Sequence, residues 1–134
     1  MMKHMERTPA MTMVGLATML TIFTASLRGE DAKPDPTVRK HWFVSGRVQG
    51  VSFRAFIYES ATDLKLTGWV RNLTDGRVEI VAAGTEKAIT QLLEKIKKGP
   101  AGARVESVKE SKADEKEKLA DHFEIHDSAT PPAP

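Results

Sequence analysis

The sequence contains no cysteine among its 134 residues, which excludes disulfide bonds, thiolate metal ligands and a cysteine nucleophile. Its net charge is only +2 at pH 7, and the chain after position 36 keeps that charge because the first 36 residues hold equal numbers of acidic and basic side chains. Proteins that bind nucleic acid usually show a larger, clustered basic excess. Aromatic residues make up 6% of the chain, which leaves few rings to stack on bases. The composition therefore gives no indication of a nucleic-acid partner.

A long apolar run is missing too, although the amino end comes close to one. Residues 13–27 carry no charge, but they are rich in threonine and shorter than the ~20 residues that a membrane-spanning helix needs. A basic start, this short apolar middle and small residues at 24–26 are typical of a secretory signal peptide. We therefore expect residues 1–27 to direct export, to the periplasm or outside the cell, without a stable membrane anchor. The alternatives are an unstructured extension of a cytoplasmic protein, or a true start at Met11 or Met13.

Prolines and charged residues mark where the folded part begins and ends. Residues 28–37 are predicted to form a linker, because Pro34 and Pro36 with charged neighbours favour neither a helix nor a strand. The proline-rich residues 128–134 are predicted to form a disordered tail. One domain over residues 38–127 remains, which lies within the usual range of ~50 to ~250 residues for a domain.

The spacing of apolar residues predicts the order of elements in this domain. Strands place apolar side chains at every second position, whereas helices repeat them every three to four residues. The expected elements are a strand over 38–48, a helix capped by Ser52, strands over 66–73 and 78–82 joined by an Asp75-Gly76 hairpin turn, a helix capped by Thr85 and ended by Gly99, and strands over 104–110 and 122–126. Two such strand–helix–strand units interleave into an α+β, ferredoxin-like split βαβ sandwich, an antiparallel sheet with two helices on one face.

The segment from Gly46 to Arg54 is the first candidate site, because it combines a strand end, a glycine loop and the first turn of a helix. Backbone N–H groups in such a loop form an anion-binding nest, and free N–H groups at a helix start add to it. The candidate donors are the N–H groups of Val48, Gln49, Gly50, Val51, Ser52 and Phe53. Arg54 is placed to close the nest with paired, charge-assisted hydrogen bonds to a phosphate. The alternative is a tight strand-to-helix connection in which the glycines only permit the turn.

The second candidate cluster comprises Gly68–Asn72 and Asp75–Glu79. Asn72 ends the second predicted strand just before the hairpin, where asparagine is often a turn former. Trp69 is expected to belong to the core or to cover a sheet face, and Arg71 is expected to face solvent. The residue pattern assigns neither of these two side chains a chemical role.

Metal-binding and nucleotide-binding patterns are missing. No glycine-rich motif ends in Lys-Ser or Lys-Thr, and no acidic pair has metal-ligand spacing. The histidines His4, His41, His122 and His126 show no ligand clustering, and strand parity places the last two on a solvated face. The charged stretch 111–118 is expected to be a solvated connection. We therefore predict neither a metal site nor a cofactor.

Both clusters resemble the signatures of the acylphosphatase family. Val48–Arg54 looks like its phosphate-binding signature, and Gly68–Asn72 with Asp75–Glu79 is similar to its second signature. The resemblance covers about residues 38–126. It departs at Lys65, where the family commonly has glycine, and in the signal-like leader, which is unusual for a family best known in the cytosol.

This resemblance implies a hydrolase that cleaves acyl phosphates, the mixed anhydrides of a carboxylate and phosphate, into carboxylate and inorganic phosphate. It implies that water attacks phosphorus without a metal, that Arg54 binds the phosphate and that Asn72 orients the water. A monomer is expected. The alternatives are a non-catalytic module that binds phosphate or an acyl phosphate and, ranked last, a nucleic-acid binder of the same topology.

Overall fold

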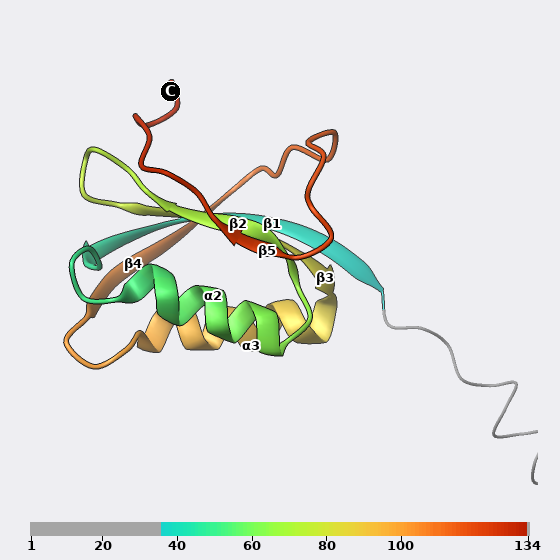
Figure 1. Ribbon diagram of the computed structural model, residues 1–134, viewed down its shortest axis with the longest axis horizontal. Helices are drawn as coiled ribbons and strands as arrows, with labels where there is room; N and C mark the ends of the chain where they lie inside the picture. Colours follow the sequence, from blue (N-terminus) through green and yellow to red (C-terminus); the bar gives the residue numbers. More distant parts are fainter. Residues whose placement is uncertain (1–35, 134) are drawn as a thin grey trace, which may run out of the picture. The chain divides into compact units, whose positions relative to one another are not determined.

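The computed structural model describes residues 36–133. Its elements are β1 (Thr37–Arg47), α2 (Phe53–Asp63), β2 (Thr67–Asn72), β3 (Val78–Thr85), α3 (Glu86–Lys98), β4 (Arg104–Ser111) and β5 (Phe123–Ile125). The five strands form one sheet in the order β4-β1-β3-β2-β5, and both helices lie on the same face of it (Figure 1). The predicted α+β, ferredoxin-like arrangement is confirmed.

One ladder differs from the predicted antiparallel sheet. β5 pairs with β2 in parallel, with Phe123 opposite Gly68, while the other ladders are antiparallel. β4 and β5 occupy opposite edges of the sheet, so the chain between them must cross from one edge to the other. It returns along β2 in the same direction as β2, which makes the sheet mixed.

The apolar core lies between the sheet and the two helices. Strand side chains and helix side chains on the facing surfaces are almost fully buried, among them Trp42, Val44, Val70, Ile80, Phe53, Ile57, Leu92 and Ile96. Burial of one side chain of this size contributes about 1.5–3 kcal/mol to folding. No helix within the described range is long and apolar enough to span a membrane.

The two predicted helix caps have different outcomes. The Thr85 hydroxyl accepts a hydrogen bond from the backbone N–H of Ala88 at 3.1 Å, as expected. Ser52 precedes α2, but its side chain makes no capping bond, so that prediction is wrong. Its φ of 62° lies in the left-handed region, whereas a capping side chain is usually carried by extended backbone. Lys65 also has a left-handed φ, of 60°, which explains why glycine suits its position.

The predicted boundaries need two corrections. Residues 1–27 and most of the expected linker lie outside the described residues, but Thr37 already pairs with Thr85 in β1 and the carbonyl of Pro36 accepts a bond from Glu86. The tail predicted to be disordered is ordered at Ala129, whose backbone pairs with Leu73 next to the end of β2. The prediction was wrong because it used only the amino-acid composition of the tail. Composition does not show that the end of β2 has a free edge with which the tail backbone can form hydrogen bonds.

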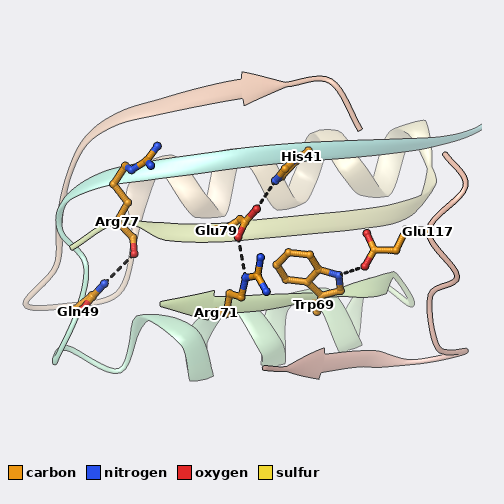
Figure 2. A network of polar contacts seen from close by, with 7 residues as sticks. All are labelled: His41, Gln49, Trp69, Arg71, Arg77, Glu79 and Glu117. Atoms are coloured by element: carbon orange, nitrogen blue, oxygen red, sulfur yellow. Dashed lines mark hydrogen bonds and ion pairs between the residues drawn. The ribbon is translucent and has the colours of Figure 1, made fainter. Parts of the chain in front are cut away.

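The face of the sheet opposite the helices is covered by polar contacts that the sequence did not indicate (Figure 2). Trp69 donates from Nε1 to Glu117 at 2.8 Å, and the Arg39 guanidinium donates to the Glu117 carbonyl at 2.8 Å. The stretch 111–118 is mostly exposed, as predicted for a solvated connection, but its Glu117 side chain also holds the buried Trp69. His122 and His126 lie on the partly exposed face opposite buried Phe123, as predicted, and His126 also stacks on the Trp69 indole, with ring centroids 5.1 Å apart.

Candidate active site

The turn from β1 into α2 is built from residues with unusual backbone angles. Gly46 has a φ of 125° at a β-bulge, and a Cβ there would collide with the carbonyl of Arg104. Gly50 and Ser52 follow with φ values of 75° and 62°. These angles bring the chain sharply from the strand into the helix, and they orient the intervening peptide groups away from regular ladder partners.

The N–H groups of this turn are free to bind an anion. The first backbone bond of α2 runs from the N–H of Phe56 to the carbonyl of Ser52 at 3.0 Å. Within residues 36–133, no N–H group from Gln49 to Ala55 donates to a protein acceptor. Such a run of unpaired donors at a helix start favours negative charge. We call residues 48–53 the amide loop.

The side chain of Gln49 ties the amide loop to the β2–β3 hairpin. Its Nε2 donates to the carbonyl of Leu73 at 2.9 Å and to that of Arg77 at 2.8 Å, the second of which is drawn in Figure 2. Gln49 was predicted only as a backbone donor. The structure adds a positioning role for its side chain, since these two bonds fix the distance between the loop and the hairpin.

A cavity of about 250 Å³ opens where the amide loop faces the end of β2. Its lining residues are Val48, Gly50, Ser52, Phe53, Arg54, Ala55, Asn72 and Ile125. Arg54 and Asn72, 18 positions apart in the sequence, thus share one cavity. Of the predicted loop residues, Gln49 and Val51 do not line it. No hydrogen bond or ion pair joins the Arg54 side chain to any other residue from 36 to 133, which leaves its guanidinium available to a ligand.

Two lining residues were not predicted. Ala55 follows Arg54 in the first turn of α2, and the free N–H groups of a helix start are the signal that could have indicated it. Ile125 reaches the cavity through the parallel pairing of β5 with β2, and it is 46% exposed. No local pattern could have found Ile125, because only the sheet topology brings it there.

Asn72 is only partly buried as a residue, but one atom of its side chain has an unusual environment. Its side-chain Oδ1 atom is buried and has no hydrogen-bond partner. Its backbone is well fixed, since Asn72 pairs with Val78 across the hairpin and its carbonyl accepts a bond from Ala129 at 3.1 Å. Buried acceptors are almost always satisfied in native proteins, so an unpaired one beside a cavity indicates a place for a water or a ligand donor.

A buried carboxylate supports the hairpin from the other face of the sheet (Figure 2). Glu79 is 2% exposed and accepts from Arg71 Nε at 2.8 Å, while its other oxygen lies 2.7 Å from His41 Nε2. Burial opposes its ionisation, but the hydrogen bonds from His41 and Arg71 outweigh that cost and lower the pKa of Glu79. Arg71 was predicted to face solvent, and this pairing corrects that expectation. Glu79 sits on β3 directly opposite Arg71, the neighbour of Asn72.

The hairpin turn itself is closed by a second charged pair. Asp75 accepts a bond from the backbone N–H of Arg77 at 3.1 Å and one from its guanidinium at 2.8 Å. These contacts, with the backbone bond first, lower the pKa of Asp75. The Arg77 guanidinium also lies 4.7 Å from the centre of the Phe43 ring, and therefore points away from the cavity. We call residues 72–78 the hairpin end.

The site contains no arrangement typical of a metal centre within the described part of the chain. Among residues 36–133, no three His, Asp or Glu side chains are grouped so that they could hold a metal ion. The residues around the cavity provide a cation, a row of amide donors and an unpaired amide oxygen. The cation and the amide donors suit a phosphate group, and the unpaired oxygen suits a water molecule beside it.

Known proteins resemble this chain in sequence and in structure. Residues 40–125, more than half of the chain, match the family model described as acylphosphatase. An acylphosphatase from Chloroflexus aurantiacus is 54% identical over 71 residues, which cover 53% of this chain and 77% of that protein. One from a Synechococcus species is 49% identical over 84 residues, covering 63% and 84%.

The solved structure of an acylphosphatase from Coxiella burnetii superimposes with a TM-score of 0.62 at 38% identity, covering 67% of this chain and 93% of that one. The family match contains the amide loop, Arg54 and Asn72. It confirms the family that the two sequence signatures predicted. This chain therefore belongs to the acylphosphatase family, hydrolases that split acyl phosphates into a carboxylate and inorganic phosphate.

Proposed function

We propose that Arg54 and the amide loop bind the phosphate group of an acyl phosphate, and that Asn72 holds the attacking water, without a metal ion. The observation that carries the proposal is that Asn72, whose Oδ1 atom is buried and unpaired, lines the same cavity as Arg54. An acceptor left unpaired in this way costs about 1–3 kcal/mol, so a water that donates to it is favoured.

Arg54 and the amide loop divide the phosphate oxygens between them. The planar guanidinium donates two parallel hydrogen bonds to two oxygens, and the free N–H groups from Gln49 to Ala55 supply donors for the others. The backbone N–H donors are fixed by the loop and the first turn of α2 before substrate arrives. They therefore stabilise charge on the phosphate without reorganising during the reaction.

Asn72 acts on the nucleophile. A water that donates one hydrogen to Oδ1 has its lone pairs directed back into the cavity, toward the phosphorus held by Arg54. The water oxygen forms the new bond to phosphorus, the bond from phosphorus to the acyl oxygen breaks, and its electron pair leaves with the carboxylate. The released proton goes to solvent. Because a carboxylate leaves readily, positioning and charge stabilisation supply the catalysis.

The test of this proposal is hydrolysis of a simple aryl acyl phosphate by the purified full chain, with and without a chelator. We expect turnover that the chelator does not change. A stable phosphate monoester should be cleaved far more slowly, since its leaving group is poor and none of the described lining residues is an acid or a histidine. Loss of turnover in chelator would contradict the metal-free step. Absence of turnover by folded protein would favour a module that only binds phosphate.

We also infer that the leader directs export, because residues 1–27 combine a basic start, an uncharged middle and small residues near position 26. The protein would then act in the periplasm or outside the cell, without a stable membrane anchor. We also propose that it is a monomer. Amino-terminal sequencing and fractionation of protein from the native host test the export, and sedimentation tests the oligomeric state. Intact Met1 in the cytosolic fraction would make the export inference wrong, and a sedimenting dimer would contradict the monomer.

A further inference from the structure

The C-terminal segment returns to the sheet beside the proposed water-holding residue. After β5 ends at Ile125, the N–H of His126 donates to the carbonyl of Val70 at 2.9 Å. The N–H of Ala129 then donates to the carbonyl of Asn72 at 3.1 Å, and the carbonyl of Ala129 accepts from Thr74 at 2.9 Å. Ala129 thus bonds to both residues that flank Leu73.

These bonds lie beyond the part of the chain that the family model matches. That match ends at residue 125, whereas the bonds to Asn72 and Thr74 come from position 129. Ile125 pairs with Val70 and Ala129 pairs with Leu73, so the C-terminal segment has one residue more than β2 between the two pairs. An extra residue of this kind bends the strand that carries it, and here the bend lies next to the cavity-lining residues Asn72 and Ile125.

Backbone bonds hold the hairpin end on both sides of β2, in addition to the Gln49 side chain that bonds Leu73 and Arg77. On the β3 side, the N–H of Leu73 donates to the carbonyl of Arg77 at 2.8 Å, and Asn72 pairs with Val78. On the outer side, the Asn72 carbonyl and the Thr74 N–H have Ala129 as their partner. Without it, the end of β2 could twist with the hairpin, and the Asn72 side chain would move with the backbone that carries it.

We propose that residues 126–130 form a C-terminal clip, in which Ala129 is a positioning residue that fixes the Asn72 backbone and so the place of the attacking water. The proposal rests on the proposed function of Asn72. It predicts an effect on turnover that is separate from phosphate binding, because the proposed phosphate donors are in residues 49–55, and within the described chain no hydrogen bond joins them to the clip.

Two matched truncations of the full protein test the clip. A chain ending at Ser128 lacks Ala129, whereas a chain ending at Thr130 keeps it and loses only the last four residues. A point variant, Ala129→Pro, removes the N–H that donates to Asn72, and Ala129→Ser keeps it as the control. Turnover of an aryl acyl phosphate, the inhibition constant of inorganic phosphate, the melting temperature and amide exchange at Thr74 are measured on the same preparations.

The chain ending at Ser128 and the Ala129→Pro variant are expected to lose roughly 10-fold in kcat per folded molecule, because a small misplacement of a reacting group is costly. Their phosphate inhibition constants should stay within about twofold of the full chain, since binding is not touched. Amide exchange at Thr74 should be faster in the chain ending at Ser128. The Thr130 and Ala129→Ser controls should match the full chain. A lower melting temperature with unchanged kcat would overturn the clip and leave Ala129 as a purely structural contact.

The Asn72→Ala background separates this proposal from the proposed function. If the clip acts through Asn72, ending the Asn72→Ala chain at Ser128 should add little to the loss already caused by Asn72→Ala. An equal fold-loss in both backgrounds would overturn the clip. A slow Asn72→Ala variant beside a truncated chain of normal kcat would overturn the clip alone, whereas normal kcat in Asn72→Ala would overturn the role of Asn72 itself.

Discussion

The amide loop and the hairpin end form opposite walls of one cavity, and they are built in different ways. The amide loop is a continuous segment whose shape comes from its own backbone angles at Gly50 and Ser52, after the bulge at Gly46 in β1. The hairpin end contributes a single side chain, Asn72, and is held by two partners from elsewhere in the chain, Gln49 and Ala129. In the proposed mechanism, phosphate binding therefore depends on local structure, whereas placement of the water depends on tertiary contacts.

This contrast explains where changes should act. A substitution in the amide loop or at Arg54 changes the donors that face the phosphate and so affects binding and rate together. A substitution that only removes Asn72 or its support from Ala129 leaves the phosphate donors in place and should change the rate alone. Gln49 connects the two walls and should affect both.

The largest expected effect is that of Arg54→Ala, which removes the cation of the amide-loop wall. We expect kcat/KM to fall by roughly 10³-fold, because a lost donor to the developing charge alone costs about 10²–10³-fold. The inhibition constant of inorganic phosphate should rise by about 10- to 100-fold. Arg54→Lys should recover little, as an ammonium cannot make the planar paired contact. Steady-state kinetics with phosphate as inhibitor checks both, and near-normal inhibition of the alanine variant would show that Arg54 is not the anchor.

Asn72→Ala tests the hairpin end. We expect kcat to fall by about 10²-fold, because the attacking water would no longer be held in place. Phosphate inhibition should remain near that of the unchanged protein. Asn72→Asp should also be slow, and it should bind phosphate more weakly because a carboxylate repels the anion. The contrary result is a lower melting temperature with kcat per folded molecule preserved. That outcome would make Asn72 a turn former and would remove the functional difference between the two walls.

Gln49→Ala should weaken the link between the walls. The loss of two hydrogen bonds is expected to lower the free energy of unfolding by about 1–3 kcal/mol, with few-fold changes in both kcat and phosphate inhibition. Gln49→Glu is the sharper variant, because its carboxylate would face the carbonyls of Leu73 and Arg77 without a hydrogen to donate. Urea unfolding together with kinetics measures both effects, and an unchanged unfolding free energy would argue against the link.

The smallest effect is expected at Glu79, behind the hairpin end. Glu79→Gln should lower the free energy of unfolding at neutral pH by about 1–2 kcal/mol, with kcat nearly unchanged, because Arg71 and His41 are partly exposed and find water instead. The matched control is Glu110→Gln, which removes an exposed carboxylate paired with Lys40 and should have little effect.

The lowered pKa of Glu79 also fixes the sign of a pH effect. As pH falls, the unfolded chain takes up the proton at this carboxyl first, near its ordinary pKa of 4.5, while the folded protein does so only at lower pH. The stabilisation by Glu79 is therefore complete above that value and is lost below it. Urea unfolding at neutral pH and at about pH 3 should show a smaller acid-induced loss in Glu79→Gln than in the unchanged protein. Equal losses would contradict the assignment.

Much of the fold could be predicted because its signals are local. Thr85 caps α3 and Gly99 ends it, as the sequence indicated, since a cap and a stop act on neighbouring residues. The prediction that Ser52 caps α2 with its side chain was wrong, because the presence of a serine does not show that its backbone angle is left-handed. The tail at Ala129 and the contact of Glu117 with Trp69 could not be predicted, because each depends on a sheet surface that exists only after folding.

The sequence by itself determined which functional groups the site contains. These are a loop of amide donors bent at glycine, an arginine in the first helical turn and an asparagine at a strand end. Only the tertiary structure decided that Arg54 and Asn72 share one cavity, that Ile125 closes it and that Ala129 holds the Asn72 backbone. The physical reason is range. Backbone angles and helix termini are set by adjacent residues, whereas sheet pairing joins segments more than 50 positions apart, and no pattern of residue types specifies which edge carbonyl a distant N–H will reach.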